Sequence, residues 1–416
     1  MKTHKGALGA IFLVVLVDLL GFGIVLPLLP YYAARFSATP LAVGLLYSVY
    51  SFAQLGFSPL WGAWSDKLGR RPIMLISTAG STGSYLLFAF SNSLPMLFAS
   101  RLFAGVMGGN ISAAQAYIAD VTTPAERARG MGVLGAAFGI GFALGPAISG
   151  LLLLPSIHNA ILHRLPTQAA AFVSENPYSL PGFAAAALSF TSFLLVSFLL
   201  PESLRPGEDE DMTRVKKVSV FSRQFWPSVF SKDSHNIARL YLCLLILMIG
   251  HSSLYSAFPL FCKQVLGMNA QQVGMQFLWL GIVTVFVQGG AIRPLVKAFG
   301  EKRLLVAGNV LMVIALISIP FALSPADLVV RLCILAVGAS LNGPTLTSLI
   351  SKEASPVNFG LVMGNAQAIS AMGRVIGPAM GGLLFGWKIQ APFLLIALLV
   401  STTVWIASTT RFQDTP

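Results

Sequence analysis

Charged residues are scarce in this sequence. Asp, Glu, Lys and Arg make up only 10% of its 416 residues, whereas 55% are hydrophobic. Soluble globular proteins carry about a quarter charged residues, so a surface that faces water throughout is excluded. Runs of roughly 20 apolar residues, enough to cross a bilayer as helices, recur along almost the whole chain. They lack the alternation of barrel strands, so the composition predicts an all-α membrane protein whose main partner is the lipid bilayer.

The sequence also lacks the motifs of enzymes and of metal-binding or disulfide-bonded proteins. The three cysteines, Cys243, Cys262 and Cys333, have no metal-like spacing and imply no disulfide framework. Nothing in the sequence matches a hydrolase, a kinase, a metal site or a Walker-type phosphate loop. We therefore expect no enzymatic activity, no cofactor, no metal and no use of ATP. The net charge of +12 is explained below by membrane topology, so it carries no inference of nucleic-acid binding.

Twelve apolar stretches are long enough to span a membrane. Between the sixth and seventh lies a charged segment, residues 201–236, which contains "GEDEDMTRVKK" and is typical of a solvated linker. We expect two six-helix bundles, residues 1–200 and 237–416, joined by this linker. The predicted spans are residues 8–34, 41–65, 72–91, 94–120, 127–154, 181–200, 237–265, 270–296, 303–323, 326–352, 357–386 and 390–410.

The distribution of Lys and Arg predicts the orientation of these spans. One alternating set of connecting segments, together with the termini, holds 20 basic residues, and the opposite set holds four. Cytoplasmic segments carry the excess of Lys and Arg, so both termini and the linker are predicted to be cytoplasmic. The N-terminal apolar run is too long for a signal peptide and lacks a convincing cleavage site. We therefore expect a multi-pass protein of a cell membrane. We also expect it to be a monomer.

The chain also repeats itself. "GPAISG" at residues 145–150 returns as "GPAMGG" at residues 377–382, and Pro27 returns as Pro259, in both cases 232 residues later. Further landmarks follow in the same order at nearly the same offset. Parallel six-helix halves of this kind are a transporter architecture, with the substrate site near the membrane midplane. Receptors and membrane enzymes have no evident need for such a duplication.

Asp18 is the acid that the spans place deepest, within "FLVVLVDLLGFGIVLPLLP". A carboxylate at the bilayer centre costs ~2.5–3.5 kcal/mol on insertion scales, so it should face a cavity or a partner. Burial raises a carboxyl pKa and a nearby Arg101 lowers it, so such a site could carry a proton near neutral pH. Asp18 could equally serve only to pair with Arg101 or to cap a bent helix. Arg101 itself could instead snorkel to the outer headgroups.

The predicted turn between the second and third spans reads "GAWSDKLGRRP". A positively charged turn would explain the arginines but not the spaced glycines and acid. The pattern resembles the signature of the major facilitator superfamily, GxxxD[RK]xGRR, which implies a cytoplasmic gate. In the second half Lys297 stands at the acid position, so the full motif occurs once. The residues that the resemblance assigns to the gate are Gly62, Asp66, Lys67, Gly69, Arg70, Arg71 and, from the fourth span onward, Asp120, Glu126 and Arg127.

The first, fourth and fifth spans extend the resemblance to the tetracycline-resistance and multidrug proton antiporters of that superfamily. "D-x-x-G-x-G-x-x-x-P-x-x-P" begins at Asp18, and the Arg-xxx-Gly pattern at Arg101 implies a role in proton coupling. The outer segment 155–179 is longer than the family usually has there. Small residues four apart let helices pack closely, and the GxxxGPxxG form is similar to the antiporter motif, although it occurs in both halves. Its residues are Gly135, Gly139, Gly141, Gly145, Pro146, Gly373, Gly377, Pro378 and Gly381.

The remaining polar residues of the spans are candidates to line a substrate cavity. His251 follows Gly250, which the repeat places opposite Asp18, and could titrate, contact a substrate or simply pack. Arg374 is a midspan cation that could meet Asp18 or attract an anionic group. The complete set is Gln54, Asn110, Gln115, His251, Tyr255, Gln276, Asn342, Gln367 and Arg374.

These features predict a secondary transporter that exports a small drug-like or amphipathic molecule in exchange for protons by alternating access of its two halves. Arg101, Arg331 and Arg374 keep open a second possibility, a proton symporter or facilitator for an anionic metabolite. A third is a sensor or scaffold that kept the fold without transport. The gate motif and Asp18 argue against this last one.

Overall fold

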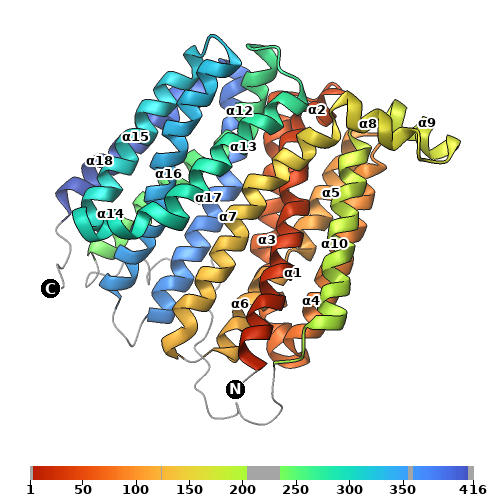
Figure 1. Cartoon of the computed structure of the whole chain (residues 1–416). Coiled ribbons are helices and arrows are strands. Elements are labelled where there is room, and N and C mark those ends of the chain that lie inside the picture. Colours follow the sequence, from red (N-terminus) through yellow and green to blue (C-terminus); the bar gives the residue numbers. More distant parts are fainter. Residues whose placement is uncertain (1–2, 123, 204–234, 355–358, 411–416) are drawn as a thin grey trace. The chain divides into compact units, whose positions relative to one another are not determined.

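A computed structural model describes residues 3–122, 124–203, 235–354 and 359–410 (Figure 1). Within these ranges every regular element is a helix, which confirms the all-α prediction. The first half of the chain contains α1 (Thr3–Val25), the 3₁₀ turn η1 (Leu26–Leu28), α2 (Leu29–Ala34), α3 (Pro40–Leu68), α4 (Arg70–Ala89), α5 (Leu94–Met107), α6 (Asn110–Val121), α7 (Pro124–Leu152), α8 (Pro155–Leu162), α9 (Thr167–Glu175) and α10 (Ser179–Leu199).

Among its described residues, the second half follows a similar order and has no counterparts of α8 and α9. Its helices are α12 (His235–Gln264), α13 (Ala270–Phe286), the π-helical turn η3 (Val287–Ala291), α14 (Ile292–Phe299), α15 (Glu301–Ser318), the 3₁₀ turn η4 (Ile319–Phe321), α16 (Pro325–Glu353), α17 (Phe359–Trp387) and α18 (Ala391–Thr409).

Ten helical stretches among the described residues are long and apolar enough to cross a membrane. The predicted third and fourth spans are the two positions missing from these ten. α4 begins with two arginines and is rich in Ser, Thr and Gly, which lowers its hydropathy. The fourth span is divided at Gly108 and Gly109 into α5 and α6, of 14 and 12 residues, each shorter than the bilayer core at 1.5 Å per residue.

Proline interrupts the first span where the sequence predicts a bend. Leu26, Pro27 and Leu28 form a 3₁₀ turn between α1 and α2, and Pro30 lies in the first turn of α2. Proline lacks the N–H that would continue the α-helical ladder, so the chain changes helix type there. Asp18 lies two turns before this change, within the regular part of α1.

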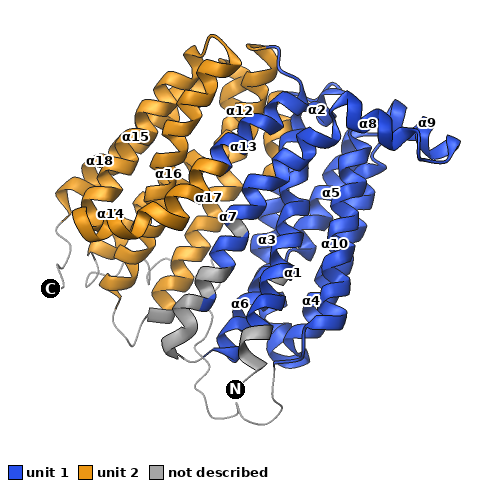
Figure 2. Ribbon diagram, viewed as in Figure 1, with its two compact units in different colours: residues 1–39, 49–210, 267–281 blue, residues 40–48, 211–266, 282–416 orange. Residues whose placement is uncertain are grey.

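The chain forms two compact units (Figure 2). Unit 1 contains residues 1–39, 49–210 and 267–281, and unit 2 contains residues 40–48, 211–266 and 282–416. Each unit therefore combines most of one half of the sequence with a short segment from the other. We call residues 267–281 the borrowed segment of unit 1, and residues 40–48 the borrowed segment of unit 2.

The two units use the same packing scheme. In unit 1, α1 packs against α7 and α10, and α4 packs against α10 and α5. In unit 2, α12 packs against α17 and α18, and α15 packs against α18 and α16. Each pair occupies the same place in its half, so the repeat seen in the sequence is also a repeat of helix contacts.

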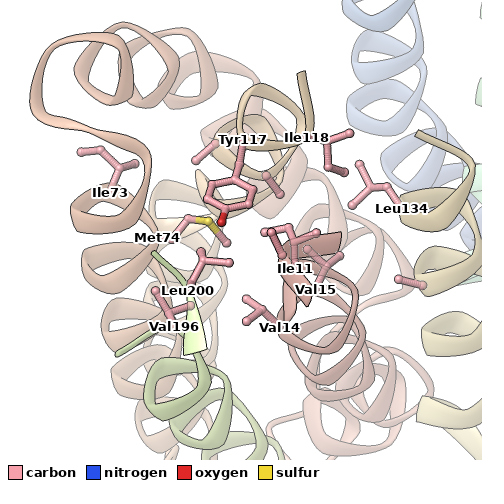
Figure 3. Close-up of a cluster of buried hydrophobic side chains, with 14 of the residues drawn as sticks. Ile11, Val14, Val15, Ile73, Met74, Tyr117, Ile118, Leu134, Val196 and Leu200 are labelled. Carbon is pink, nitrogen blue, oxygen red and sulfur yellow. The ribbon is translucent and has the colours of Figure 1, made fainter. Parts of the chain in front are cut away.

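A buried apolar cluster holds unit 1 together near the start of α1 (Figure 3). Side chains of α1, α4, α6, α7 and α10 converge there, including Ile11, Met74, Tyr117 and Leu134, each less than 5% exposed. Lipid tails are as apolar as these side chains, so close packing rather than escape from water stabilises such contacts. The cluster fixes the ends of α4, α6 and α10 beside one another. We call this end of each unit, where α10 ends and α12 begins, the linker end.

Candidate functional site

Asp18 lies in the interior of unit 1, where the residue is 9% exposed. The hydroxyl of Ser189 on α10 donates to Asp18 Oδ1 at 3.4 Å and also lies 3.2 Å from the carbonyl oxygen of Thr78 on α4. Asp18 therefore faces α4 and α10. A carboxylate placed there is removed from lipid and has a polar neighbour, as the cost of intramembrane charge requires.

Arg101 is the largest side chain among those that are almost completely buried, with 1% exposed. Its guanidinium carbon lies 5.9 Å from the ring centre of Tyr85 and 5.5 Å from that of Phe88, both on α4. These distances are those of cation–π interactions, which strengthen when the cation is shielded from water. The guanidinium thus points into the helix bundle, and snorkelling to the headgroups is not its arrangement in this structure.

Tyr85 joins these two charged residues and was not among the residues that the sequence pointed to. A Cβ on Gly21, one turn after Asp18, would lie 3.4 Å from the Tyr85 ring. The Tyr85 hydroxyl is within electrostatic reach of both Asp18 and Arg101. A signal existed in the sequence, because Tyr85 continues the helical face that Thr78 and Ser81 begin. Asp18, Tyr85, Arg101 and the hydroxyl groups beside them form what we call the buried polar group of unit 1.

The antiporter-type glycines bring α7 against the helix that carries Asp18. A Cβ on Gly141 would collide with Leu19 of α1, and one on Gly145 would collide with Gly23. Backbones approach this closely only where side chains are absent. Gly135 and Gly139 have no neighbour within 4 Å of such a Cβ, so the first part of the motif does not serve this contact.

The second half repeats the arrangement between α17 and α12. Added Cβ atoms on Gly373, Gly377 and Gly381 would meet α12 at Met248, Ser252 and Ser253 respectively. This correspondence explains why the motif occurs twice, since each half needs one tight pair of helices.

The two prolines of the motif mark contacts with the borrowed segments. In unit 1, a Cβ on Gly274 of α13 would meet the carbonyl oxygen of Pro146. In unit 2, one on Gly44 of α3 would meet the carbonyl oxygen of Pro378, and the Ala379 N–H donates to Ser48 Oγ at 3.1 Å. Both contacts are at the end of the unit opposite the linker.

The gate motif forms an ion cluster at the linker end of unit 1. Arg70, 7% exposed, donates from Nε to Asp120 Oδ2 at 3.0 Å and from Nη1 to Asp66 Oδ1 and, at 2.9 Å, to Ser65 Oγ. Burial by itself lowers the pKa of this guanidinium, but the hydrogen bonds to Asp120 and Asp66 outweigh it and hold the pKa above its ordinary value. Arg70 thus joins Asp66 and Asp120, the two acids that the sequence resemblance assigns to the gate.

The other predicted gate residues surround this cluster. Gly62 is buried, Lys67 is exposed, and Gly69 has the positive φ of +103° that glycine tolerates best. The Arg71 guanidinium donates from Nη2 to the carbonyl oxygen of Ser197 at 2.6 Å, which connects α4 to α10. The side chains of Glu126 and Arg127 lie outside the described residues.

Unit 2 has an ion cluster at the corresponding turn, with the charges reversed. Glu301, the first residue of α15, accepts from Lys352 Nζ at 2.7 Å and from Ser348 Oγ at 2.6 Å. Lys302 donates from Nζ to the carbonyl oxygen of Thr410 at 2.7 Å, beyond the end of α18. The sequence predicted a degenerate motif here because Lys297 replaces the acid, and the structure shows a different set of partners in its place.

The nine predicted cavity residues divide between the units. Gln54, Gln115 and Gln276 belong to unit 1, and the Asn110 side chain lies outside the described residues. Gln54 Nε2 donates to the Tyr50 hydroxyl at 3.3 Å. That these residues line one cavity stays a prediction. The members in unit 2 are His251, Tyr255, Asn342, Gln367 and Arg374.

Two of the unit 2 residues contact each other. The rings of His251 and Tyr255 pack edge to face with centres 5.6 Å apart, and Tyr47 of the borrowed segment lies 6.3 Å beyond. Tyr255 is also within electrostatic reach of Arg374 on α17. Aromatic side chains beside a half-buried cation are suited to bind a flat or anionic organic group.

Three features together define the class of this protein. It has two membrane-spanning repeats with one packing scheme, an acid and an arginine buried inside the first repeat, and an ion cluster at the same turn of each repeat. The class is that of the secondary transporters built from parallel repeats. The family model of the Major Facilitator Superfamily matches residues 11–294 and 240–416. The chain belongs to this superfamily: it is a multi-pass membrane transporter of small molecules and not an enzyme.

Several characterised members are similar over nearly the whole chain. A "Tetracycline resistance protein, class D" of Salmonella ordonez is 28% identical over 411 residues, covering 96% of this chain and 92% of the relative. A "Multidrug resistance protein 2" of Bacillus subtilis (strain 168) is 27% identical over 419 residues, covering 97% of each. The crystal structure of the human organic anion transporter MFSD10 is 25% identical, with a TM-score of 0.69, and covers 98% of this chain and 100% of that one.

Proposed function

We propose that this transporter exports small drug-like or amphipathic organic molecules in exchange for protons. The observation that carries the proposal is the buried polar group of unit 1. Asp18 is 9% exposed and Arg101 is 1% exposed, and Tyr85 lies within electrostatic reach of both. The likeness to proteins named for tetracycline and multidrug resistance supports export of such molecules.

A proton would act on this group through the charge of Asp18. With Asp18 ionised, its charge and that of Arg101 would stabilise one another in an environment of low dielectric constant. With Asp18 protonated, Arg101 loses that stabilisation and the arrangement of α1, α4 and α5 becomes less favourable. A proton that binds one conformation better than another shifts their populations, and this difference would drive alternation between inward-open and outward-open states.

The orientation and assembly are part of the proposal. The excess of Lys and Arg on the side of the termini supports a cytoplasmic linker end, and the ion cluster around Arg70 would then close the cytoplasmic side. Protons would then enter from outside and substrate would leave from inside. A monomer suffices, because both repeats belong to one chain.

A second candidate function is transport of an organic anion. The observation that favours it is the group formed by Tyr255, His251 and Arg374 in unit 2, where a cation lies beside aromatic rings. The likeness to a structure titled as an organic anion transporter supports it as well.

Flux measurements in proteoliposomes separate these functions. Under an imposed pH gradient, antiport moves protons against the substrate and symport moves them with it. We expect drug-dependent proton movement in the antiport direction, which Asp18→Asn abolishes while the protein remains folded and binds substrate. Glu175→Gln, which removes an exposed acid at the opposite end of unit 1, is the matched control and should keep full flux. Proton-driven flux that survives in Asp18→Asn would refute the coupling mechanism.

A further inference from the structure

The first turn of α4 places positive charge where a helix tolerates it least. Arg70 and Arg71 are its first two residues, and Gly69 before them has no side chain to act as a cap. The first N–H groups of a helix have no partner within the helix, and that end carries a partial positive charge. The turn therefore needs an acceptor, preferably an anion, from another segment.

Glu202 supplies that acceptor from just beyond the end of α10. Its Oε1 accepts the Arg70 N–H at 2.9 Å and its Oε2 accepts the Arg71 N–H at 3.1 Å. Gly69 leaves the space for it, because a Cβ at that position would collide with the Glu202 carboxylate. One carboxylate thus accepts hydrogen bonds from two backbone N–H groups and opposes the positive charge of the helix end. Hydrogen bonds to an ionised acceptor are stronger than those between neutral groups.

The residue after Glu202 extends the connection to the ion cluster. Ser203 Oγ donates to Asp120 Oδ2 at 2.9 Å, the same oxygen that accepts from Arg70 Nε at 3.0 Å. The beginning of the segment that joins the two halves therefore contacts both α4 and Asp120 at the end of α6.

We propose that Glu202 is a positioning residue of this ion cluster. It holds the first turn of α4 in the geometry that lets Arg70 bridge Asp66 and Asp120, and with Ser203 it fastens the start of the linker to the cluster. Displacement of these two residues would release the first turn of α4 and, with it, the position of Arg70. The linker is thereby mechanically connected to the gate motif, a role that holds whatever substrate or coupling ion the transporter uses.

Hydrogen–deuterium exchange of the full-length protein in detergent or nanodiscs tests the capping part. In Glu202→Ala we expect the amides of Arg70 and Arg71 to exchange about tenfold faster or more, as loss of a charge-assisted hydrogen bond implies. Glu202→Gln keeps an acceptor without charge and should show a smaller increase. The first turn of α15, which has its own Glu301, is the internal reference. Glu175→Gln is the control and should leave both turns unchanged.

A double-mutant cycle separates positioning from a merely structural cap. Glu202→Gln and Asp120→Asn, alone and combined, are compared by thermal unfolding and by the rate at which Arg70 and Arg71 amides exchange. If Glu202 positions Arg70 for Asp120, the effects of the two substitutions are not additive, and Glu202→Asp, which keeps the charge, restores part of the protection. Unchanged exchange in Glu202→Ala, or strictly additive effects in the cycle, would overturn the proposal.

Discussion

The turn before α4 in unit 1 and the turn before α15 in unit 2 share their backbone and differ in their charges. Each passes through a glycine at positive φ, +103° at Gly69 and +79° at Gly300, and each helix begins at the next residue. That residue is Arg70 in one case and Glu301 in the other, 231 positions later. The backbone of the repeat is thus retained while the sign of its first side chain is reversed.

The difference shows two ways of stabilising the start of a helix. Glu301 at the first position of α15 opposes the positive helix end itself and also binds Lys352 on α16. Arg70 adds to that positive charge, so acids must come from elsewhere: Asp66 on α3, Asp120 on α6 and Glu202 beyond α10. The unit 1 cluster connects four segments of the chain, whereas in unit 2 the ion pair of Glu301 connects only α15 and α16. Equivalent substitutions should therefore have larger effects in unit 1.

The largest difference is expected for alanine at the two glycines. An L-residue in this backbone region costs ~1–3 kcal/mol, so both Gly69→Ala and Gly300→Ala should lower the stability of the protein. Gly300 has open space around a new Cβ, whereas at Gly69 the Cβ would collide with Glu202. Denaturant unfolding in detergent should therefore show Gly69→Ala to be the more damaging by at least ~1 kcal/mol. If both variants lost the same unfolding free energy, the contact between Gly69 and Glu202 would not contribute to stability.

Removing one ion partner from each cluster should have the next largest effect. Asp120→Ala leaves Arg70, whose side chain is 9% exposed, with one acid fewer, and we expect a loss of ~1–2 kcal/mol after allowing for the partial exposure of Asp120. Lys352 is 46% exposed, so Lys352→Ala should cost under ~1 kcal/mol. Thermal unfolding of the two variants at low and high salt checks this, because only the exposed pair should respond strongly to salt.

Exchanging the charges in unit 2 isolates the contribution of the helix end. Glu301→Lys and Lys352→Glu should each destabilise by about 1 kcal/mol, and the double variant should recover the ion pair. Recovery should stay incomplete by ~0.3–1 kcal/mol, because a lysine at the first position of α15 opposes the helix dipole. The double variant imitates unit 1 without its Glu202. Complete recovery of stability would show that the dipole contributes nothing at this turn.

The smallest effect is expected from the hydroxyl partners. Ser348→Ala leaves Glu301 paired with Lys352, and Ser203→Ala leaves Asp120 paired with Arg70. Each should cost only about 0.5 kcal/mol, the lower end for a hydrogen bond, because the acid keeps its cationic partner. The amide exchange of α4 should respond slightly to Ser203→Ala and not to Ser348→Ala. A response of α4 to the unit 2 substitution would contradict the separation of the two clusters.

Much of the fold was predictable from the sequence because the membrane imposes strong local rules. Hydropathy, the repeat and the bend at Pro27 are properties of neighbouring residues, and the gate motif places Asp66 within one turn of Arg70. Tyr85 and Glu202 could not be found in the same way. Tyr85 shares a helical face with Thr78 and Ser81, but its electrostatic partner Asp18 lies 67 residues away. Glu202 binds the Arg70 backbone 132 residues away, and no local pattern identifies such distant partners.

The division of the fourth span also depends on a contact between distant residues, but here the sequence predicted one helix where the structure has two. Hydropathy joined α5 and α6 into one predicted span, 94–120, because the two glycines at 108 and 109 do not interrupt an apolar run. Glycine is only weakly unfavourable in a helix, so its presence alone does not predict a break. The nearby Trp61 indole requires glycine at 109, since a Cβ there would collide with it, and this contact between distant residues is not visible in the local sequence.

That break makes the fourth span a jointed rod. The carbonyl oxygens that the missing helical turn would have used are taken by other helices: Trp61 Nε1 donates to Val106 at 2.5 Å, and Ser77 Oγ donates to Met107. These two carbonyl groups are therefore bonded, and the joint lies between Arg101 in α5 and Asp120 in α6. A change in angle at this one place would tilt α5 relative to α6 and so change the separation between the buried arginine and the linker-end acid.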